Sequence, residues 1–244
     1  LYKFILIQKN SFIFESVEKG KIRGRYTIIG FNPDKIFNIK NNKIIEDNFV
    51  KKKIIKKDIL IYLDNLFKKF KVKSSKELPR MSSMLVGYFS YDIIRLIEKI
   101  PNKCKEDIDI PDIRLMRPKN LVIYDNVKKK VFYIENIYRD QKIHDYEMEY
   151  NKINKKLNEL HHFGNIPLPY NFHKSNKKIK IKSNISKSKF KKNVQKAKTY
   201  IKKGDIFQVV LSQRFKANID KPPLEIYNKL REINPSPFMF YFNY

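Results

Sequence analysis

The sequence predicts an α+β protein built mostly from antiparallel β-sheet with flanking helices. Short apolar runs separated by turn residues fill the first 45 residues, a pattern typical of antiparallel strands. Residues 58–70 and 145–160 instead carry apolar residues at spacings of three and four, which indicates amphipathic helices. Helix-like and strand-like segments then alternate between residues 188 and 242. Together these patterns favour sheets with helices packed against them.

The N-terminal strands are expected at Phe12–Phe14, Tyr26–Phe31 and Ile36–Ile45. Two groups of turn-forming residues, Asn32-Pro33-Asp34 and Asn41-Asn42, interrupt this region and are predicted as turns. The first helix is expected over Asp58–Phe70, with Asp58 as its N-cap. Its apolar stripe consists of Ile59, Tyr62, Leu63, Leu66, Phe67 and Phe70.

The central part of the chain repeats these signals in shorter segments. The predicted elements are a strand at Leu85–Tyr91, a helix at Ile93–Ile100 capped by Asp92 and stopped by Pro101, strands at Asn120–Tyr124 and Lys130–Ile137 joined by a hairpin at Asp125-Asn126-Val127, and a polar helix at Asp145–Leu160.

A lysine- and serine-rich stretch at 165–185 divides the chain into a predicted N-terminal domain, 1–164, and a second domain that starts at 186 and runs to 244. In the second part Ser188 is expected to cap a helix with Phe190, Val194, Ala197 and Ile201 on its apolar side, ending at Gly204. The elements expected after it are a strand at Ile206–Phe215, a helix at Pro222–Ile233 and a strand at Phe238–Phe242.

The charge balance alone would suggest a nucleic-acid partner. Lys and Arg total 53 against 25 Asp and Glu, a net charge of +28. However, lysine makes up most of this surplus, and specific phosphate or base recognition relies on the arginine fork. A solvated lysine-rich surface is therefore favoured over a nucleic-acid patch, which stays open as the alternative.

Composition excludes several other protein classes. The single cysteine, Cys104, cannot form an internal disulfide, which fits a reducing compartment. No apolar run reaches the roughly 20 residues that cross a bilayer, so a soluble, cytoplasmic protein is expected. The histidines are unsuited to a metal site, because His161 and His162 are adjacent and no cysteine lies near them. No phosphate-binding glycine loop is present.

Two segments carry polar residues in patterns that could serve a ligand. If Ile206–Phe215 is a strand, Gln208, Ser212 and Arg214 share one face, which would suit either a ligand pocket or a half-exposed edge strand. The segment Asn234-Pro235-Ser236-Pro237 ends a helix and fixes an extended turn, which by itself is a structural feature. The residues alone leave both alternatives open.

Taken together, the motifs resemble those of anthranilate synthase component I, and they occur in the same order along nearly the whole chain. The matching segments are Phe14–Glu18, Arg23–Gly30, Val86–Asp92 with Arg95–Glu98, Gly204–Phe215 and Asn234–Tyr241. The sequence departs from the usual pattern at Ser82, Ser83 and Ser90, where the family often has glycine, and at Phe238, where tyrosine is common.

The resemblance implies an enzyme that converts chorismate and ammonia to anthranilate and pyruvate, the first committed step of tryptophan biosynthesis. Ammonia would come from glutamine through a separate amidotransferase subunit. The chain has no initiator methionine and stops at Tyr244 within an aromatic run that resembles an unfinished strand, so it is expected to be a fragment. The magnesium ligands and acid/base residues belong to the C-terminal half of the family and are therefore expected beyond Tyr244. Within the chain, Gln208 is the one expected residue of the catalytic pocket. The 244-residue chain alone is therefore expected to be inactive.

The resemblance also implies feedback inhibition by tryptophan. The family's inhibitor-binding positions match Ser16, Pro237, Phe238 and Met239, with Glu15, Arg23 and Asn234 as further candidates. These residue types suit the ligand, because a serine hydroxyl can bond the amino-acid group, and an aromatic ring and a thioether can contact an indole. The alternatives are aminodeoxychorismate synthase component I, which is similar along the Gln208 segment, and a lysine-rich nucleic-acid-binding module.

Overall fold

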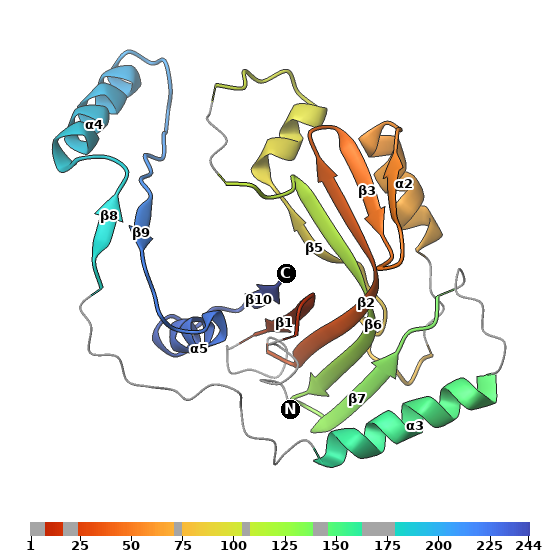
Figure 1. Cartoon of the computed structure of the whole chain (residues 1–244). Helices are drawn as coiled ribbons and strands as arrows, with labels where there is room; N and C mark the ends of the chain where they lie inside the picture. The colour runs from red at the N-terminus through yellow and green to blue at the C-terminus, as the bar shows by residue number, and fades with distance from the viewer. Residues whose placement is uncertain (1–7, 17–23, 71–74, 104–107, 139–145, 163–178) are drawn as a thin grey trace. The chain divides into compact units, whose positions relative to one another are not determined.

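A computed structural model gives the fold of the chain (Figure 1), and it describes residues 8–16, 24–70, 75–103, 108–138, 146–162 and 179–244. The structure is α+β, as expected, and strand pairing in it is antiparallel. It divides into two compact units. Unit 1 consists of Leu1–Leu168 and Leu224–Tyr244, and unit 2 consists of Pro169–Pro223.

Unit 1 is built on an eight-stranded sheet in which β10-β1-β2-β3-β4 form one path, while β6 pairs with β2, β5 and β7. The strands are β1 (Ser11–Glu15), β2 (Tyr26–Lys40), β3 (Lys43–Asp47), β4 (Lys52–Ile55), β5 (Val86–Phe89), β6 (Ile113–Asp125), β7 (Lys130–Glu135) and β10 (Met239–Asn243). β10, the last strand of the chain, thus lies beside the first, as Figure 1 shows.

The predicted turn at Asn32-Pro33-Asp34 is wrong, because β2 runs through it as one strand with a register shift between Pro33 and Lys35. The shift is stabilised by contacts with residues that lie far from β2 in the sequence. Arg117 of β6 donates from Nε to Asp34 Oδ1 at 2.7 Å, and its guanidinium lies 4.0 Å from the centre of the Tyr138 ring. The predicted turn at Asn41-Asn42 is confirmed, with φ values of 49° and 58°.

Three clusters of buried side chains form the core of unit 1. One of them surrounds Phe12, which is fully buried and contacts the rings of Phe14 and Phe242. Gly30 makes room for Phe12, since a Cβ atom there would lie 2.0 Å from the ring. The remaining two clusters pack α5 (Pro223–Ile233) and α2 (Ile59–Lys69) against this sheet.

Helix α2 (Ile59–Lys69) confirms the first helix prediction. Asp58 caps it by accepting a hydrogen bond from the Ile61 N–H at 2.9 Å, and Ile59, Tyr62 and Leu63 are buried against β2 and β3. The helix predicted after Asp92 is instead a 3₁₀-helix, η1 (Tyr91–Leu96), which starts after Ser90. There Asp92 accepts from Arg95 and does not act as the cap. The hairpin β6–β7 and the polar helix α3 (Tyr146–His162) are confirmed.

Helix α5 (Pro223–Ile233) and β10 confirm two further predictions, yet both belong to unit 1. Leu224 and Tyr227 of α5 are buried with Ile13, Ile29, Val122 and Met239. The boundaries of the compact units therefore differ from those of the predicted domains, 1–164, 165–185 and 186–244. That division into sequence domains stays a prediction. The physical reason for the difference is the pairing of β10 with β1.

Unit 2 contains α4 (Lys187–Lys202) and the short pair β8 (Ile181–Ser183) and β9 (Phe215–Ala217). Ser186 caps α4, and not Ser188 as predicted, because the Ser186 side chain accepts from the Lys189 N–H at 3.2 Å. Gly204 ends the helix with φ 77°, as expected. The strand predicted at Ile206–Phe215 is wrong for residues 206–214, which pair with no strand of the described chain. Only Phe215, the first residue of β9, lies in a strand.

Within the part of the chain that the structure describes, no helix is both long enough and apolar enough to span a membrane.

Candidate functional site

The two ends of the predicted inhibitor site meet at the β1–β10 pair. The register places Glu15 opposite Met239, and one further residue along each strand brings Ser16 next to Phe238. We call Glu15, Ser16, Pro237, Phe238 and Met239 the β1–β10 site. Its parts come from opposite ends of the chain, and antiparallel pairing alone brings them together.

Ser16 contributes a hydroxyl group that is shielded from solvent and has no hydrogen-bond partner among the described residues. Its Oγ atom is buried and makes no hydrogen bond to any described residue. Buried polar atoms are nearly always hydrogen-bonded, and leaving one unpaired costs about 1–3 kcal/mol. This atom is therefore prepared to bond a ligand.

Phe238 contributes an exposed aromatic surface beside that hydroxyl. Its side chain is 88% exposed, and Phe240, two residues along, is 64% exposed. Phe240 lies opposite Phe14 in register, and Ser16 and Phe238 each lie one residue beyond the last pair, Glu15 and Met239. Because side chains alternate between the faces of a strand, this order groups Phe238 and Phe240 with Ser16 and Phe14. The site thus combines a buried hydroxyl with an open aromatic face.

Met239 has a different role from the one expected for it. Its side chain is only 7% exposed and packs with Leu224 and Tyr227 of α5 on the other face of the strand pair. Its thioether is therefore occupied by the core and supports β10 from behind. A ligand ring on the Ser16 face would contact Phe238 before Met239.

Glu15 lies on that same α5 side and is held in place by the helix. Its Oε1 atom accepts from the Tyr227 hydroxyl at 2.6 Å and lies 3.0 Å from Arg231 Nε. The side chain of Glu15 is 8% exposed, so the positive charge of Arg231 compensates a nearly buried carboxylate. These contacts tie α5 to the end of β1 and hold Ser16 in position.

The remaining predicted residues are Arg23, Asn234 and Pro237. Arg23 lies outside the described residues. Asn234 is exposed at the end of α5, where its N–H donates to the Leu230 carbonyl at 2.8 Å. Pro237 is half-buried and leads the chain into β10.

Sequence reasoning missed Tyr227 and Arg231, which hold Glu15. A signal was available, because the two residues are four apart on a predicted helix and thus share one of its faces. Their partner could not be identified from that spacing, since it lies at the other end of the chain.

Gln208, the predicted catalytic residue, lies in unit 2 in an irregular segment between α4 and β9. Its side chain is exposed, as are Ser212 and Arg214, and the neighbouring Phe207 is 98% exposed. The expected division into a polar and an apolar face is therefore absent from this segment. The other predicted site residues that the structure describes belong to unit 1.

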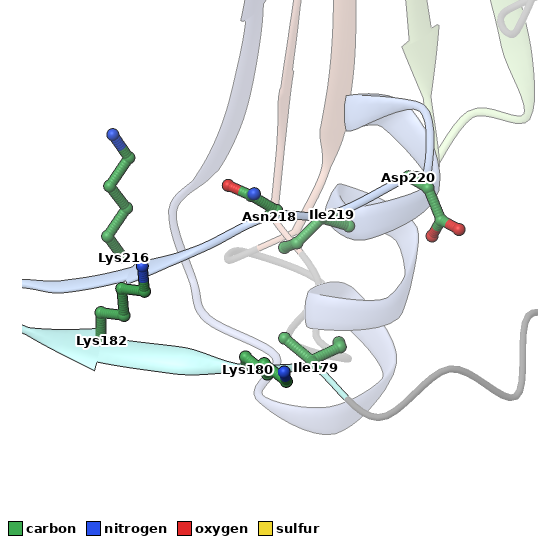
Figure 2. A pocket seen from close by; sticks show the side chains of 7 residues that line it. All are labelled: Ile179, Lys180, Lys182, Lys216, Asn218, Ile219 and Asp220. Atoms are coloured by element: carbon green, nitrogen blue, oxygen red, sulfur yellow. The ribbon is translucent and has the colours of Figure 1, made fainter.

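Unit 2 also contains an open, positively charged hollow of about 720 Å³ (Figure 2). Lys182 and Lys216 line it from paired positions on β8 and β9, and Lys180 and Asp220 lie further along it. Like charges directly opposite on paired strands repel each other, so this hollow favours an anion. None of the predicted site residues lines it.

A magnesium site needs several oxygen ligands close together. Nowhere among them do three or more Asp, Glu, His or Cys side chains come together in a way that could hold a metal ion. The described part of the chain therefore does not fit that ion.

Comparisons with known proteins agree with the motifs. The family model described as chorismate binding enzyme matches residues 9–244. Anthranilate synthase component 1 of Acetivibrio thermocellus is 36% identical over 243 residues, which cover 96% of this chain and 48% of that protein. The corresponding protein of Aquifex aeolicus is 34% identical over 237 residues, covering 95% of this chain and 47% of that protein.

A solved structure gives the same result at the level of the fold. The crystal structure of anthranilate synthase component I from Streptococcus pneumoniae superposes with a TM-score of 0.71 at 28% sequence identity, covering 86% of this chain and 46% of that one. The chain thus spans about half the length of the relatives that it matches. With the family model matching nearly all of its residues, the chain belongs to the chorismate binding enzyme family.

Proposed function

We propose that the protein to which this chain belongs is an anthranilate synthase component I, which converts chorismate and ammonia to anthranilate and pyruvate. The observation that carries the proposal is the similarity to proteins of that name, at 32–36% identity over nearly the whole chain. The ordered motifs at both ends of unit 1 and around Gln208 support it.

The choice of ammonia over water as nucleophile is consistent with Gln208. Isochorismate and salicylate synthases resemble this segment but carry lysine at this position, and a lysine of lowered pKa can accept a proton from water. The amide of Gln208 cannot act as such a base. The proposal includes two further components, a magnesium ion that holds chorismate and an amidotransferase subunit that delivers ammonia.

Product analysis tests this function. The protein that contains this chain is incubated with chorismate, ammonium and magnesium, and the products are separated and identified. Anthranilate is expected as the main product, and Gln208→Ala is expected to lower its rate of formation. Gln195→Ala, on the exposed surface of α4, serves as the matched control and should match the parent. Aminodeoxychorismate or isochorismate as the main product would overturn the proposal.

We further propose that the β1–β10 site binds tryptophan as a feedback inhibitor. In this arrangement the Ser16 hydroxyl bonds the ligand's polar amino-acid group, and the exposed rings of Phe238 and Phe240 contact the indole. Support comes from the unpaired Ser16 Oγ and from the exposed Phe238 beside it.

Inhibition assays on the intact enzyme test this regulation. Ser16→Phe should fill the site and abolish inhibition by tryptophan, while activity with ammonia is retained, because inhibition depends on coupling between two separate sites. Inhibition at the same tryptophan concentration as in the parent would show that Ser16 is not part of the site.

A further inference from the structure

A cavity in unit 1, of about 480 Å³, lies at the other end of β1 from Ser16. It is bounded by Lys9 just before β1, by Phe31 and Pro33 at the irregular part of β2, and by Phe49 in the turn between β3 and β4. Its volume falls in the range of small-molecule pockets, about 300–1,000 Å³.

Asn120 and Tyr133 bring a buried polar network to this cavity. Asn120 is only 2% exposed and uses all its groups: its Nδ2 donates to Tyr133 Oη at 2.8 Å and to Glu135 Oε2 at 3.1 Å, and its Oδ1 accepts from Asn32 at 2.9 Å. The Tyr133 oxygen is thus an acceptor in this network. Its own O–H has no acceptor among the described residues, so it remains a donor for a ligand.

The Tyr133 hydroxyl also keeps its proton at neutral pH. Burial and the nearby charge of Glu135 raise its pKa to about 12. Glu135 in turn has Lys119 3.3 Å away, which offsets its negative charge. A hydrogen-bond donor is therefore available at the cavity across the physiological pH range.

Aromatic and proline side chains form the walls of the cavity. Phe49 stands out because its φ is 66°, a sterically unfavourable conformation for a bulky residue, and its side chain is 55% exposed. The turn enforces this conformation, since Asp47 Oδ1 accepts from the Phe49 N–H at 2.8 Å and Asn48 Oδ1 accepts from the Lys51 N–H at 2.8 Å. Strained residues of this kind cluster at ligand clamps.

Lys9 adds a positive charge to the same wall and forms no ion pair with any described residue. A ligand that carries a carboxylate would accept from both the Lys9 ammonium and the Tyr133 O–H, in charge-assisted hydrogen bonds. A flat ring on that ligand would fit between the aromatic walls.

We propose that this cavity binds a small carboxylate with a single aromatic ring. The ring contacts Phe31 and Phe49, and the carboxylate accepts from Tyr133 and Lys9. The cavity is separate from the β1–β10 site, because Lys9 precedes β1 whereas Ser16 follows it. This inference goes beyond the proposed function and does not depend on it.

Calorimetric titration of the 244-residue chain with benzoate, anthranilate and benzyl alcohol tests this site. Both carboxylates should bind at least about tenfold more tightly than the neutral alcohol, because a hydrogen bond to a charged group contributes about 1.5–3 kcal/mol. Tyr133→Phe should weaken benzoate binding about tenfold for the same reason. Tyr124→Phe is the matched control, since it removes a half-buried phenolic hydroxyl from β6, and it should bind benzoate as the parent does.

A second variant tests the wall without disturbing the polar network. Phe49→Gly relieves the strained φ, so its thermal stability should equal or exceed that of the parent while its affinity for benzoate falls several-fold. Equal binding of benzoate and benzyl alcohol, unchanged affinity in Tyr133→Phe or Phe49→Gly, or loss of benzoate binding in Ser16→Phe would each overturn the proposal.

Discussion

Units 1 and 2 contain similar local sequence signals for helices, but their side chains are buried to different extents. Helices α2 and α4 both have an apolar stripe and a capping side chain at the start, Asp58 in one and Ser186 in the other. In unit 1, Ile59, Tyr62 and Leu63 of the α2 stripe are buried against the sheet, whereas Phe67 at its far end is 46% exposed. In unit 2, residues 179–223 include no buried residue, and Ile201 of α4 is 43% exposed.

The difference shows that local propensity and burial are separate contributions. An amphipathic helix in a protein gains most of its stability from the surface that it packs against, and less from its caps and propensity. Unit 1 supplies that surface through strands from both ends of the chain. Stability, like burial, is therefore expected to be concentrated in unit 1.

The largest effect is expected from a matched pair of phenylalanine truncations. Phe12→Ala removes a fully buried ring from unit 1 and should lower the free energy of unfolding by about 3–5 kcal/mol. Phe190→Ala removes a partly exposed ring from α4 and should cost less than about 1 kcal/mol. Urea denaturation followed by circular dichroism measures both. Equal losses in the two variants would contradict the contrast between the units.

A smaller effect, confined to one pH range, is expected at the ion pair of Arg25 and Asp125 in unit 1. Asp125, with 2% of its side chain exposed, accepts from Arg25 at 2.8 Å and from the N–H groups of Val127 and Lys128 at 3.0 Å. These bonds, chiefly the one with Arg25, hold the pKa of Asp125 well below its usual value. A carboxylate with a lowered pKa stabilises the fold above its unfolded pKa of about 3.9, and this stabilisation is lost as the pH falls further.

Asp125→Asn should therefore be less stable than the parent at pH 7, and the two should converge as the pH falls below about 4. Thermal unfolding at a series of pH values measures this difference. Asp109→Asn is the control, because Asp109 is 96% exposed in its pair with Lys40 and contributes little in solvent. A constant difference between Asp125→Asn and the parent at all pH values would show that the carboxylate charge is not the cause.

The smallest effect is expected from loss of the helix caps. Asp58→Ala and Ser186→Ala each remove a cap hydrogen bond of about 1 kcal/mol. In α2 the loss should lower the stability of unit 1 as a whole. In α4 it should only speed hydrogen exchange within α4, because little else depends on that helix. Hydrogen exchange measured by mass spectrometry separates these outcomes, and faster exchange throughout unit 1 in Ser186→Ala would contradict the prediction.

Elements defined by local signals could be predicted from the sequence, and those defined by distant partners could not. The spacing of apolar residues and the cap at Asp58 predicted α2 to within a residue. By contrast, the turn expected at Asn32-Pro33-Asp34 is an irregularity inside β2, because Asp34 pairs with Arg117 on another strand. The strand expected around Gln208 does not form, since a strand needs a neighbour to pair with.

The same rule holds for the sites. Motif resemblance identified Ser16 and Phe238, and their proximity follows from the pairing of β1 with β10. The commitment of Met239 to the core could not be predicted, because the side of β10 that faces α5 depends on the register. The available O–H donor of Tyr133 could not be predicted either, since it results from Asn120 donating to the Tyr133 oxygen.

The most direct test of a β1–β10 site that is complete within unit 1 is tryptophan binding to the 244-residue chain, measured by calorimetry. The chain contains no tryptophan of its own, so binding can also be followed by the ligand's fluorescence. We expect saturable binding of one tryptophan per chain, lost in Ser16→Phe and retained in Phe190→Ala. An absence of binding in the parent, or equal binding in Ser16→Phe, would contradict this assignment.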